Sequence, residues 1–316
     1  MSKQDRSRDL IIVGGGPAGF SAGIYAARAS LDALVLEQGM PGGQIATSDT
    51  IDNYPGIPSM RGAELGDAMR AHAEEAGAAV DYAMVESISR DDDGFFHVDT
   101  GDEVLTAPAV IVATGAKPRQ GGFEGEETYR GRGVSYCATC DAMFYRGKRV
   151  YVIGGGNSAC EEALFLSRIA REVIMVVRRD VFRAPRGIVD RLLAQDNVSV
   201  RYQTSIVKLA GETMPTEITF RDNASGDLSV ETLDAGSFGI FVFTGTDPET
   251  ALVSDLVDLA DDGGVLTDGR MATRTPGLYC AGDMRHTELR QVITAASDGA
   301  VAATFAYRYL DEGGLL

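Results

Sequence analysis

The sequence predicts an α/β protein of two domains, each built around its own βαβ unit. The order strand, glycine-rich turn, helix, strand occurs in residues 10–37 and again in residues 149–177. A length of 316 residues allows two domains that each bury a core. Glycine supplies 38 residues, well above the usual ~7%, without a collagen-like period, so we expect the glycines in specific loops.

The composition is that of a folded protein and argues against two classes of partner. Hydrophobic residues make up 44% and charged residues 24% of the chain, as in globular domains. The net charge of −17 would repel nucleic acids and anionic membranes. The opening ten residues are highly charged and no apolar run reaches the roughly 18 residues of a membrane span, so we expect a cytoplasmic protein without a signal peptide.

The first βαβ unit carries a dinucleotide-binding fingerprint. The strand LIIV is followed by G-x-G-x-x-G, and Pro17 begins an alanine-rich helix. Gly14 would permit the tight turn, Gly16 would let a pyrophosphate approach the backbone, and Gly19 would let the helix pack closely. Glu37 ends the next strand, where a carboxylate can bind an adenosine ribose. A glycine turn without a ligand is the alternative.

The second unit consists of a strand and its glycine turn at 149–156, a helix near 157–170 and a strand at 172–177, and the turn fits G-x-G-x-x-A. Where the first unit has an acid, this unit has Arg178 and Arg179, with Arg183 close behind. Forked guanidinium groups favour a 2′-phosphate, so the pattern favours NADP(H) over NAD(H), with a solvated basic turn as the alternative. Two different dinucleotides are predicted, most simply FAD and NADPH.

The remaining segments predict that one domain is inserted into the other. Residues 80–106 alternate apolar and polar positions, as in a small antiparallel meander. The strand at 109–119 and the turn-rich segment at 245–250 are the two expected crossings between domains. Short strands fill the stretch from 198 to 243, and a strand at 277–283 precedes a helix from about 289 to 311.

Cys137-Ala-Thr-Cys140 lies just before the second unit, and Asp141 follows it. This spacing indicates a redox disulfide or half of a zinc site. Zinc is poorly supported because no other Cys or His pair stands at finger-like spacing, and we predict no metal. Asp141 suits redox chemistry, in which a group must move protons as thiolates form and leave.

Three other residues are interpreted from their surroundings. Cys160 lies on the helix after the second glycine loop and Cys280 in the apolar strand LYCAG, and we expect both to be buried without a chemical role. Asp283 follows an apolar strand, where it could contact a ribityl hydroxyl or a flavin edge, or could cap the following helix.

Together these residues resemble the low-molecular-weight thioredoxin reductases, which are NADPH-dependent flavoproteins. The resemblance covers nearly the whole chain and depends on motifs in the family's order: GGGPAG at 14–19, GGQI at 42–45, NYPG at 53–56, ATGAKPR at 113–119, GVSYCATCD at 133–141, GGGNSACEEA at 154–163, RRDVFRA at 178–184, AGD at 281–283 and RQ at 290–291. It implies two Rossmann-like domains: a discontinuous FAD domain (1–117 and 247–316) and an inserted NADPH domain (118–246) that carries the redox cysteines. It also implies a homodimer.

The resemblance implies roles for individual residues. Cys140 would face the flavin, Cys137 would attack the partner disulfide, and Asp141 would be the acid–base. The FAD site would comprise Gly14, Gly16, Pro17, Ala18, Gly19, Glu37, Gln44, Asn53, Asp283, Arg290 and Gln291. The NADPH site would comprise Gly156, Asn157, Ser158, Ala159, Arg178, Arg179 and Arg183. Thioredoxin would dock near Arg132, Met143 and Phe144, and the crossings, at Gly115 and Gly245, would be hinges.

The implied activity passes electrons from NADPH through FAD and the Cys137–Cys140 disulfide to thioredoxin. The chain departs from the family at four positions: Val177 replaces the usual His before the two arginines, Val292 follows RQ in place of Ala, Thr246 replaces the His of a G-H-x-P turn that keeps Pro248, and Met143 replaces an aromatic residue. We expect Val177 to weaken nucleotide affinity only modestly, because the arginines remain. Val292 could change the surroundings of the flavin edge, and Met143 is an adaptable residue that suits a different partner surface.

Four other functions compete with this interpretation. A relative that takes electrons from ferredoxin, or that acts as a dithiol oxidase, tends to lose the arginine site that this chain retains. A peroxide-system reductase would need additional domains before the first glycine loop. A ferredoxin–NADP reductase has no use for CATCD. A nucleotide-sensing module with a structural C-x-x-C would be colourless when purified.

Overall fold

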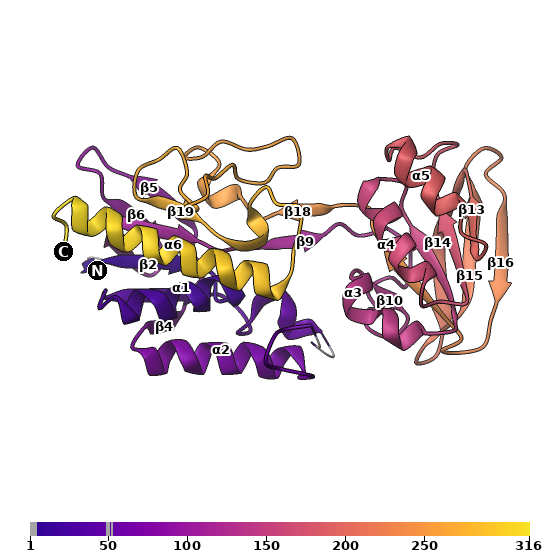
Figure 1. Cartoon of the computed structure of the whole chain (residues 1–316), viewed down its shortest axis with the longest axis horizontal. Helices are drawn as coiled ribbons and strands as arrows, with labels where there is room; N and C mark the ends of the chain where they lie inside the picture. Colours follow the sequence, from indigo (N-terminus) through magenta and orange to yellow (C-terminus); the bar gives the residue numbers. More distant parts are fainter. Residues whose placement is uncertain (1–4, 49–50, 52) are drawn as a thin grey trace. The chain divides into compact units, whose positions relative to one another are not determined.

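The computed structural model describes residues 5–48, 51 and 53–316, and its chain divides into two compact units (Figure 1). Unit 1 combines Met1–Lys117 with Asp247–Leu316, and unit 2 is Pro118–Thr246. Two short strands, β9 (Ala116–Pro118) and β18 (Thr246–Pro248), pair with each other where the chain passes from one unit to the other. Part of the charged opening segment of the sequence lies outside the described residues.

Unit 1 is built on a five-stranded parallel sheet. Its order is β19 (Leu278–Cys280), β8 (Ala109–Val112), β2 (Leu10–Val13), β3 (Ala33–Glu37) and β4 (Ala79–Tyr82). Every residue of β2, β3, β8 and β19 is buried, which explains their continuous apolar sequences. The strand that precedes the first glycine loop therefore lies at the centre of this sheet.

Helices cover one face of this sheet and a meander covers the other. The helices are α1 (Pro17–Arg28), α2 (Gly62–Ala76) and α6 (Val292–Glu312), and α6 runs alongside α1 (Figure 1). A Cβ at Gly299 of α6 would lie 1.9 Å from the Ala18 carbonyl oxygen, so only glycine allows this close approach. The second layer has the order β1 (Asp5–Ser7), β7 (Val104–Ala107), β6 (Phe96–Asp99) and β5 (Ser87–Arg90).

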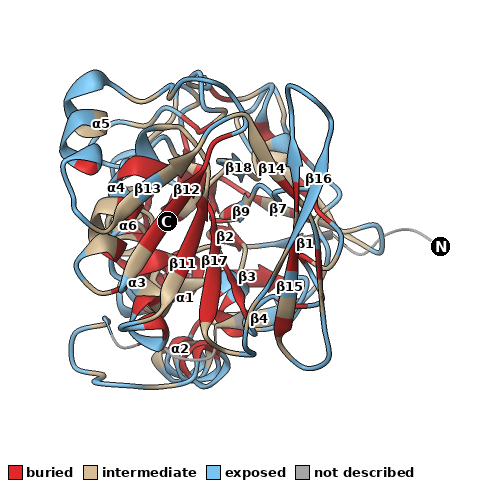
Figure 2. Ribbon diagram, turned by 90° about the vertical axis from the view of Figure 1, so that its right-hand side faces the viewer, coloured by how far each residue is buried: buried red, intermediate tan, exposed pale blue. Residues whose placement is uncertain are grey.

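Unit 2 repeats this design with another parallel sheet. Its order is β10 (Val134–Ser135), β17 (Phe238–Val242), β11 (Arg149–Ile153), β12 (Glu172–Val176) and β13 (Val198–Arg201). Val150 and Val152 face α3 (Ala138–Asp141), α4 (Asn157–Ser167) and α5 (Arg186–Leu193), whereas Tyr151 packs against the antiparallel strands. Those strands are β14 (Thr204–Gly211), β15 (Pro215–Asp222) and the exposed edge strand β16 (Leu228–Thr232) (Figure 2).

The structure confirms most of the predicted elements and corrects two of them. The predicted strand at 33–37 and the start of the helix at Pro17 are as expected. Residues 79–82, however, form β4 of the parallel sheet, so the meander is shorter than the alternation predicted. The last helix begins at Val292 and not at 289. No helix among the described residues is long and apolar enough to cross a membrane.

Candidate functional site

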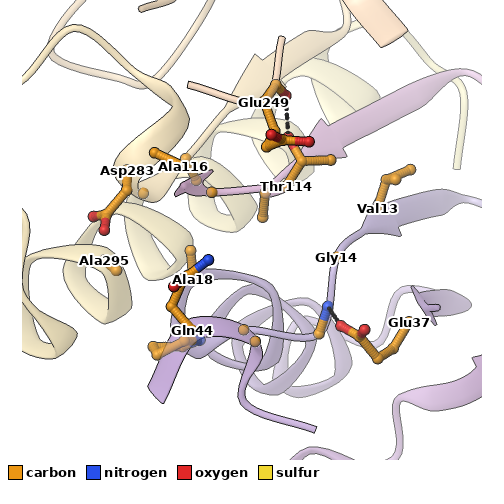
Figure 3. Close-up of a pocket in the computed structure, with 18 of the residues that line it drawn as sticks. Val13, Gly14, Ala18, Glu37, Gln44, Thr114, Ala116, Glu249, Asp283 and Ala295 are labelled. Atoms are coloured by element: carbon orange, nitrogen blue, oxygen red, sulfur yellow. Dashed lines mark hydrogen bonds between the residues drawn. The ribbon is translucent and has the colours of Figure 1, made fainter. Parts of the chain in front are cut away.

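A cavity of about 360 Å³ lies in unit 1 at the carboxyl ends of the parallel strands (Figure 3). This edge is where open α/β sheets bind ligands. The first glycine loop, the end of β3, the short helices η1 (Gly43–Thr47) and η4 (Gly282–Met284) and the start of α6 all contribute to its walls. Of the predicted FAD residues, those lining it are Gly14, Gly16, Pro17, Ala18, Glu37, Gln44, Asp283 and Gln291.

The three glycines of the first loop have different geometric roles. Gly14 has φ +108°, and a Cβ there would lie 2.4 Å from the Ala113 carbonyl oxygen. Gly19 is covered by the loop itself, since a Cβ would lie 1.7 Å from the Gly14 carbonyl oxygen. At Gly16 the nearest atom to such a Cβ is 3.9 Å away. The loop is therefore open at Gly16, at the N-terminus of α1, where backbone N–H groups and the helix dipole favour a phosphate.

Glu37 is a buried carboxylate that holds this loop (Figure 3). Its Oε2 accepts a hydrogen bond from the Gly15 N–H at 2.6 Å, and its Oε1 accepts one from the Gly39 N–H at 2.7 Å. Each carboxylate oxygen can accept a further bond, and the residue lines the cavity. The side chain can therefore order the loop and also accept hydrogen bonds from ligand hydroxyl groups.

Asp283 lies on another wall of the cavity, in a turn fixed from α6. Burial raises the pKa of Asp283 to about 6. Gly282, at φ +77°, donates its N–H to the Asp298 carboxylate at 3.1 Å, and Arg285 pairs with the same carboxylate at 2.8 Å. Asp298 therefore positions the Asp283 turn, a contribution that the sequence motifs did not indicate.

The other three predicted FAD residues do not line the cavity. Gly19 packs against the loop, Asn53 donates to the Gln291 side chain at 2.9 Å, and Arg290 donates to the Asp283 carbonyl oxygen at 3.4 Å. Asn53 and Arg290 thus contact residues of the cavity wall.

Unit 2 has its own cavity, of about 270 Å³, beside the second glycine loop. Arg178, Arg179 and Arg183 are exposed and line it. The Gly155 carbonyl oxygen accepts the Arg183 N–H at 2.7 Å, so the arginine loop is attached to the glycine loop. Arg119 also lines this cavity, and sequence analysis missed it because it precedes the βαβ unit by thirty residues.

The remaining predicted NADPH residues form the start of α4 and do not line this cavity. Gly156 is the N-cap, Asn157 and Ser158 are exposed, and Ala159 is buried. A Cβ at Gly154 would lie 2.5 Å from the Phe243 carbonyl oxygen and 2.8 Å from the Ala159 Cβ. Gly156 is open, because a Cβ there would have only an Arg183 nitrogen nearby, at 3.9 Å.

Cys137 and Cys140 form a disulfide bond with a Cα–Cα distance of 5.3 Å. Cys137 is the N-cap of α3, and the Cys140 N–H donates to its Sγ at 3.2 Å. Ser135 holds the preceding backbone, because its Oγ accepts the Cys137 N–H at 3.1 Å and donates to the Cys137 carbonyl oxygen at 3.2 Å. Both cysteines and Asp141 are partly exposed. A thiol-disulfide partner can therefore reach this bond.

An exposed apolar pair lies just after the cysteines. Met143 and Phe144 are 53% and 52% exposed. Arg132 is also exposed, and it donates to the Thr128 carbonyl oxygen at 2.7 Å.

The other two cysteines are buried, as predicted, with no exposed surface on either. Burial raises the pKa of the Cys160 thiol to about 11 and that of the Cys280 thiol to about 12, so both are unreactive near neutral pH. Within residues 5–48, 51 and 53–316, no group of three or more His, Cys, Asp or Glu side chains is arranged to hold a metal ion.

Two nucleotide-type α/β units and a C-x-x-C disulfide define an oxidoreductase that acts on disulfides. The chain belongs to the pyridine nucleotide-disulphide oxidoreductase family, whose model matches residues 8–299, and within it to the thioredoxin reductases. Membership implies the use of a flavin and a pyridine nucleotide.

Three comparisons support the assignment to the thioredoxin reductases. The thioredoxin reductase of Treponema pallidum is 43% identical over 304 residues, which is 96% of this chain and 97% of that one. The thioredoxin reductase of Listeria monocytogenes is 37% identical over 313 residues, or 99% and 97% of the two chains. The crystal structure of thioredoxin reductase from Streptococcus pyogenes has a TM-score of 0.89 at 37% identity and covers 98% of this chain and 100% of that chain.

Proposed function

We propose that the protein is an NADPH-dependent thioredoxin-disulfide reductase that holds FAD in unit 1 and NADPH in unit 2. The observation that carries the proposal is the Cys137–Cys140 disulfide in the same unit as a cavity lined by arginines. One unit then binds the electron donor and carries the disulfide that reduces the partner.

The unit 1 cavity suits FAD. The open backbone at Gly16 suits the pyrophosphate, and Glu37 suits the adenosine ribose. Asp283 and Gln44 would contact the ribityl and flavin portions. When bound, the flavin would supply the acceptor for a hydride from the nicotinamide and the two electrons that open the disulfide.

The unit 2 cavity suits NADPH. The three arginines of its predicted site, Arg178, Arg179 and Arg183, present exposed guanidinium groups of the kind that pairs bidentately with a 2′-phosphate. Gly156, Asn157, Ser158 and Ala159 begin α4 and would bind the pyrophosphate at its N-terminus. Val177 is buried and lines the same cavity, so its difference from the family's usual histidine changes an apolar part of the wall and leaves the exposed arginines in place.

The reduced cysteines would carry out thiol–disulfide exchange. The Cys137 thiolate attacks one partner sulfur, the partner's S–S bond breaks, and a mixed disulfide forms. The Cys140 thiolate then attacks Cys137 Sγ, which restores the internal disulfide and releases the partner as a dithiol. Two electrons and two protons leave with the partner, and Asp141 would exchange the proton at Cys140 as its thiolate forms and reacts.

The partner proposed is thioredoxin or a similar small dithiol protein. Met143 and Phe144 offer it an exposed apolar contact beside the disulfide, with the Arg132 guanidinium as a charged contact. The crossings at Gly115 (φ +74°) and Gly245 (φ +131°) would absorb the rotations that bring the disulfide and the nicotinamide to the flavin in turn. Homodimeric assembly and a cytoplasmic location remain predictions from the sequence.

The main alternative is a related flavoprotein that uses ferredoxin or acts as a dithiol oxidase. The arginine-lined cavity favours NADPH over that alternative, since ferredoxin has no 2′-phosphate to bind.

An anaerobic titration of the purified protein with NADPH, and separately with NADH, tests the proposal. We expect NADPH to bleach the flavin absorbance rapidly and NADH to do so poorly. Bound flavin that neither nucleotide reduces would contradict the proposal and favour the ferredoxin or dithiol-oxidase alternative. A colourless protein that binds no added FAD would contradict the flavin assignment itself.

A further inference from the structure

Unit 2 contains a buried carboxylate outside all the predicted site residues. Glu126 is only 4% exposed. Its Oε1 accepts hydrogen bonds from the Gly121 N–H at 2.7 Å and from the Tyr136 hydroxyl at 2.6 Å. Its Oε2 accepts the Gly122 N–H at 2.8 Å and a weaker bond from the Phe123 N–H at 3.4 Å. Four donors thus surround one carboxylate, which compensates for its removal from water.

These donors belong to two different parts of the proposed site. Gly121 and Phe123 line the arginine cavity, next to Arg119. Tyr136 is the residue before Cys137, and it stands between that cysteine and Ser135, whose hydroxyl fixes the Cys137 backbone. The Arg130 guanidinium lies 5.2 Å from the centre of the Tyr136 ring and holds the tyrosine from another side. Glu126 is therefore bonded both to a wall of the cavity and to the segment that presents the redox disulfide.

We propose that Glu126 is a positioning residue that fixes the wall of the nucleotide cavity and, through Tyr136, the backbone that presents Cys137. This inference depends on the proposed function, because it assigns a nucleotide to the cavity and an attacking role to Cys137. Loss of the Tyr136 bond would loosen residues 135–137. The Cys140 N–H, which donates to Cys137 Sγ in the disulfide, would then hold that sulfur less well, and in the reduced protein the Cys137 thiolate would lose a hydrogen bond.

Three variants separate the two contacts. E126Q keeps the side-chain volume but exchanges one acceptor oxygen for an NH₂ group, which must face a donor in either orientation. Y136F removes the tyrosine contact and leaves the three backbone donors paired with Glu126. E124Q is the matched control, because Glu124 is exposed and its carboxylate forms a surface ion pair with Lys208, at 2.8 Å.

Two measurements that need neither flavin reduction nor thioredoxin give the result. The first is the Kd for NADP⁺, measured by calorimetry. The second is the rate at which iodoacetamide alkylates Cys137 in the reduced protein, measured as a function of pH, with mass spectrometry to confirm that Cys137 is the alkylated residue. For E126Q we expect Kd to rise at least fivefold, alkylation at pH 7 to fall at least threefold, and the alkylation midpoint to move to higher pH. Y136F should show only the alkylation changes, and E124Q should stay within twofold of wild type in both.

Other results would overturn the inference. If folded E126Q matches wild type in both measurements, Glu126 positions neither element. If Y136F alters the Kd as much as E126Q does, or leaves alkylation unchanged, the separate roles are wrong, and this test holds even if E126Q fails to fold. A wild-type protein that does not bind NADP⁺ would contradict the proposed function, whereas normal NADP⁺ binding with unaffected variants would contradict only the role of Glu126.

Discussion

Unit 1 and unit 2 place their glycine loops after the central strand of the same kind of sheet, β2 in one and β11 in the other. In both, helices cover one face and a mainly antiparallel sheet covers the other. The two units differ in the residues at the end of the next strand. Unit 1 has the buried Glu37, which is bonded to its own loop, and unit 2 has exposed arginines. The same fold therefore provides a site with a buried carboxylate in unit 1 and a site with exposed guanidinium groups in unit 2.

The charge of the chain shows the same division. Unit 1 contains 13 Lys and Arg against 30 Asp and Glu, whereas unit 2 contains 16 of each, so the whole net charge of −17 belongs to unit 1. A cofactor that stays bound can tolerate acidic surroundings once its contacts are made. An anionic nucleotide that binds and leaves in every cycle gains from a neutral domain with local arginines. The charge difference agrees with a resident flavin in unit 1 and an exchanging nucleotide in unit 2.

The largest effect should come from removing the sulfur of unit 2 that we propose as the attacking one. In C137S we expect the rate of thioredoxin reduction to fall below the detection limit, because no mixed disulfide with thioredoxin can form. The rate at which NADPH reduces the flavin should stay within about threefold of wild type. Steady-state thioredoxin reduction and anaerobic stopped-flow absorbance measure the two steps. Normal turnover in C137S would show that Cys137 is not the attacking sulfur.

The last small residue of each glycine fingerprint, Gly19 in unit 1 and Ala159 in unit 2, allows a direct comparison of the two loops. G19A would place a Cβ 1.7 Å from the Gly14 carbonyl oxygen, so we expect a loss of about 3 kcal/mol in the free energy of unfolding, together with weaker flavin retention. Its counterpart A159G, also at the third residue of its helix, should cost about 1 kcal/mol, the usual penalty of glycine in a helix. Urea unfolding and flavin absorbance measure these effects, and equal losses would contradict the difference.

The sequence predicted the sheets and loops well because their signals are local. A buried strand between two layers is continuously apolar, as in LIIV and in the first four residues of ALVLE, and a tight turn needs glycine at a positive φ, as at Gly14. β4 was misassigned because none of its residues is fully buried, so its mixed sequence AVDY resembles a meander strand more than the apolar run of a central strand. Helix α2 was missed for a related reason: most of its residues are exposed, and only four are buried.

Site residues that belong to a sequence motif could be predicted, whereas those that depend on contacts between distant parts of the chain could not. Glu37 and the arginines come at the ends of their strands in the sequence, so spacing located them. Arg119 lines its cavity together with residues of other elements, Asp298 accepts the Gly282 N–H from another element, and Glu126 accepts the hydroxyl of Tyr136 from the segment before the cysteines. No spacing rule connects a carboxylate on α6 to the Gly282 turn, and such contacts become visible only once the chain is folded.

A smaller effect is expected when the arginines of unit 2 are removed. R178A/R179A should raise the KM for NADPH about 10- to 100-fold, a loss of about 1.4 kcal/mol for each factor of ten, because the 2′-phosphate loses its cations. The KM for NADH should change less than about threefold, and flavin retention in unit 1 should not change. Initial rates with both nucleotides measure this. An equal rise for NADPH and NADH would mean that these arginines do not bind the 2′-phosphate.

The smallest effect tests the acidic character of the unit 1 cavity. Because burial raises the pKa of Asp283 from 3.8 to about 6, ionisation of this carboxyl opposes folding. The penalty is absent below about pH 4, grows as the pH rises through about 6, and is complete above that. D283N removes this penalty. In flavin-free protein, the unfolding free energy of D283N minus that of wild type should therefore increase by up to about 1 kcal/mol between pH 5.5 and pH 8.

Urea unfolding at both pH values measures the change, with D92N at an exposed turn as the control. A pH-independent difference between D283N and wild type would show that Asp283 ionises as freely in the folded protein as in the unfolded chain, and that the cavity wall does not disfavour its negative charge.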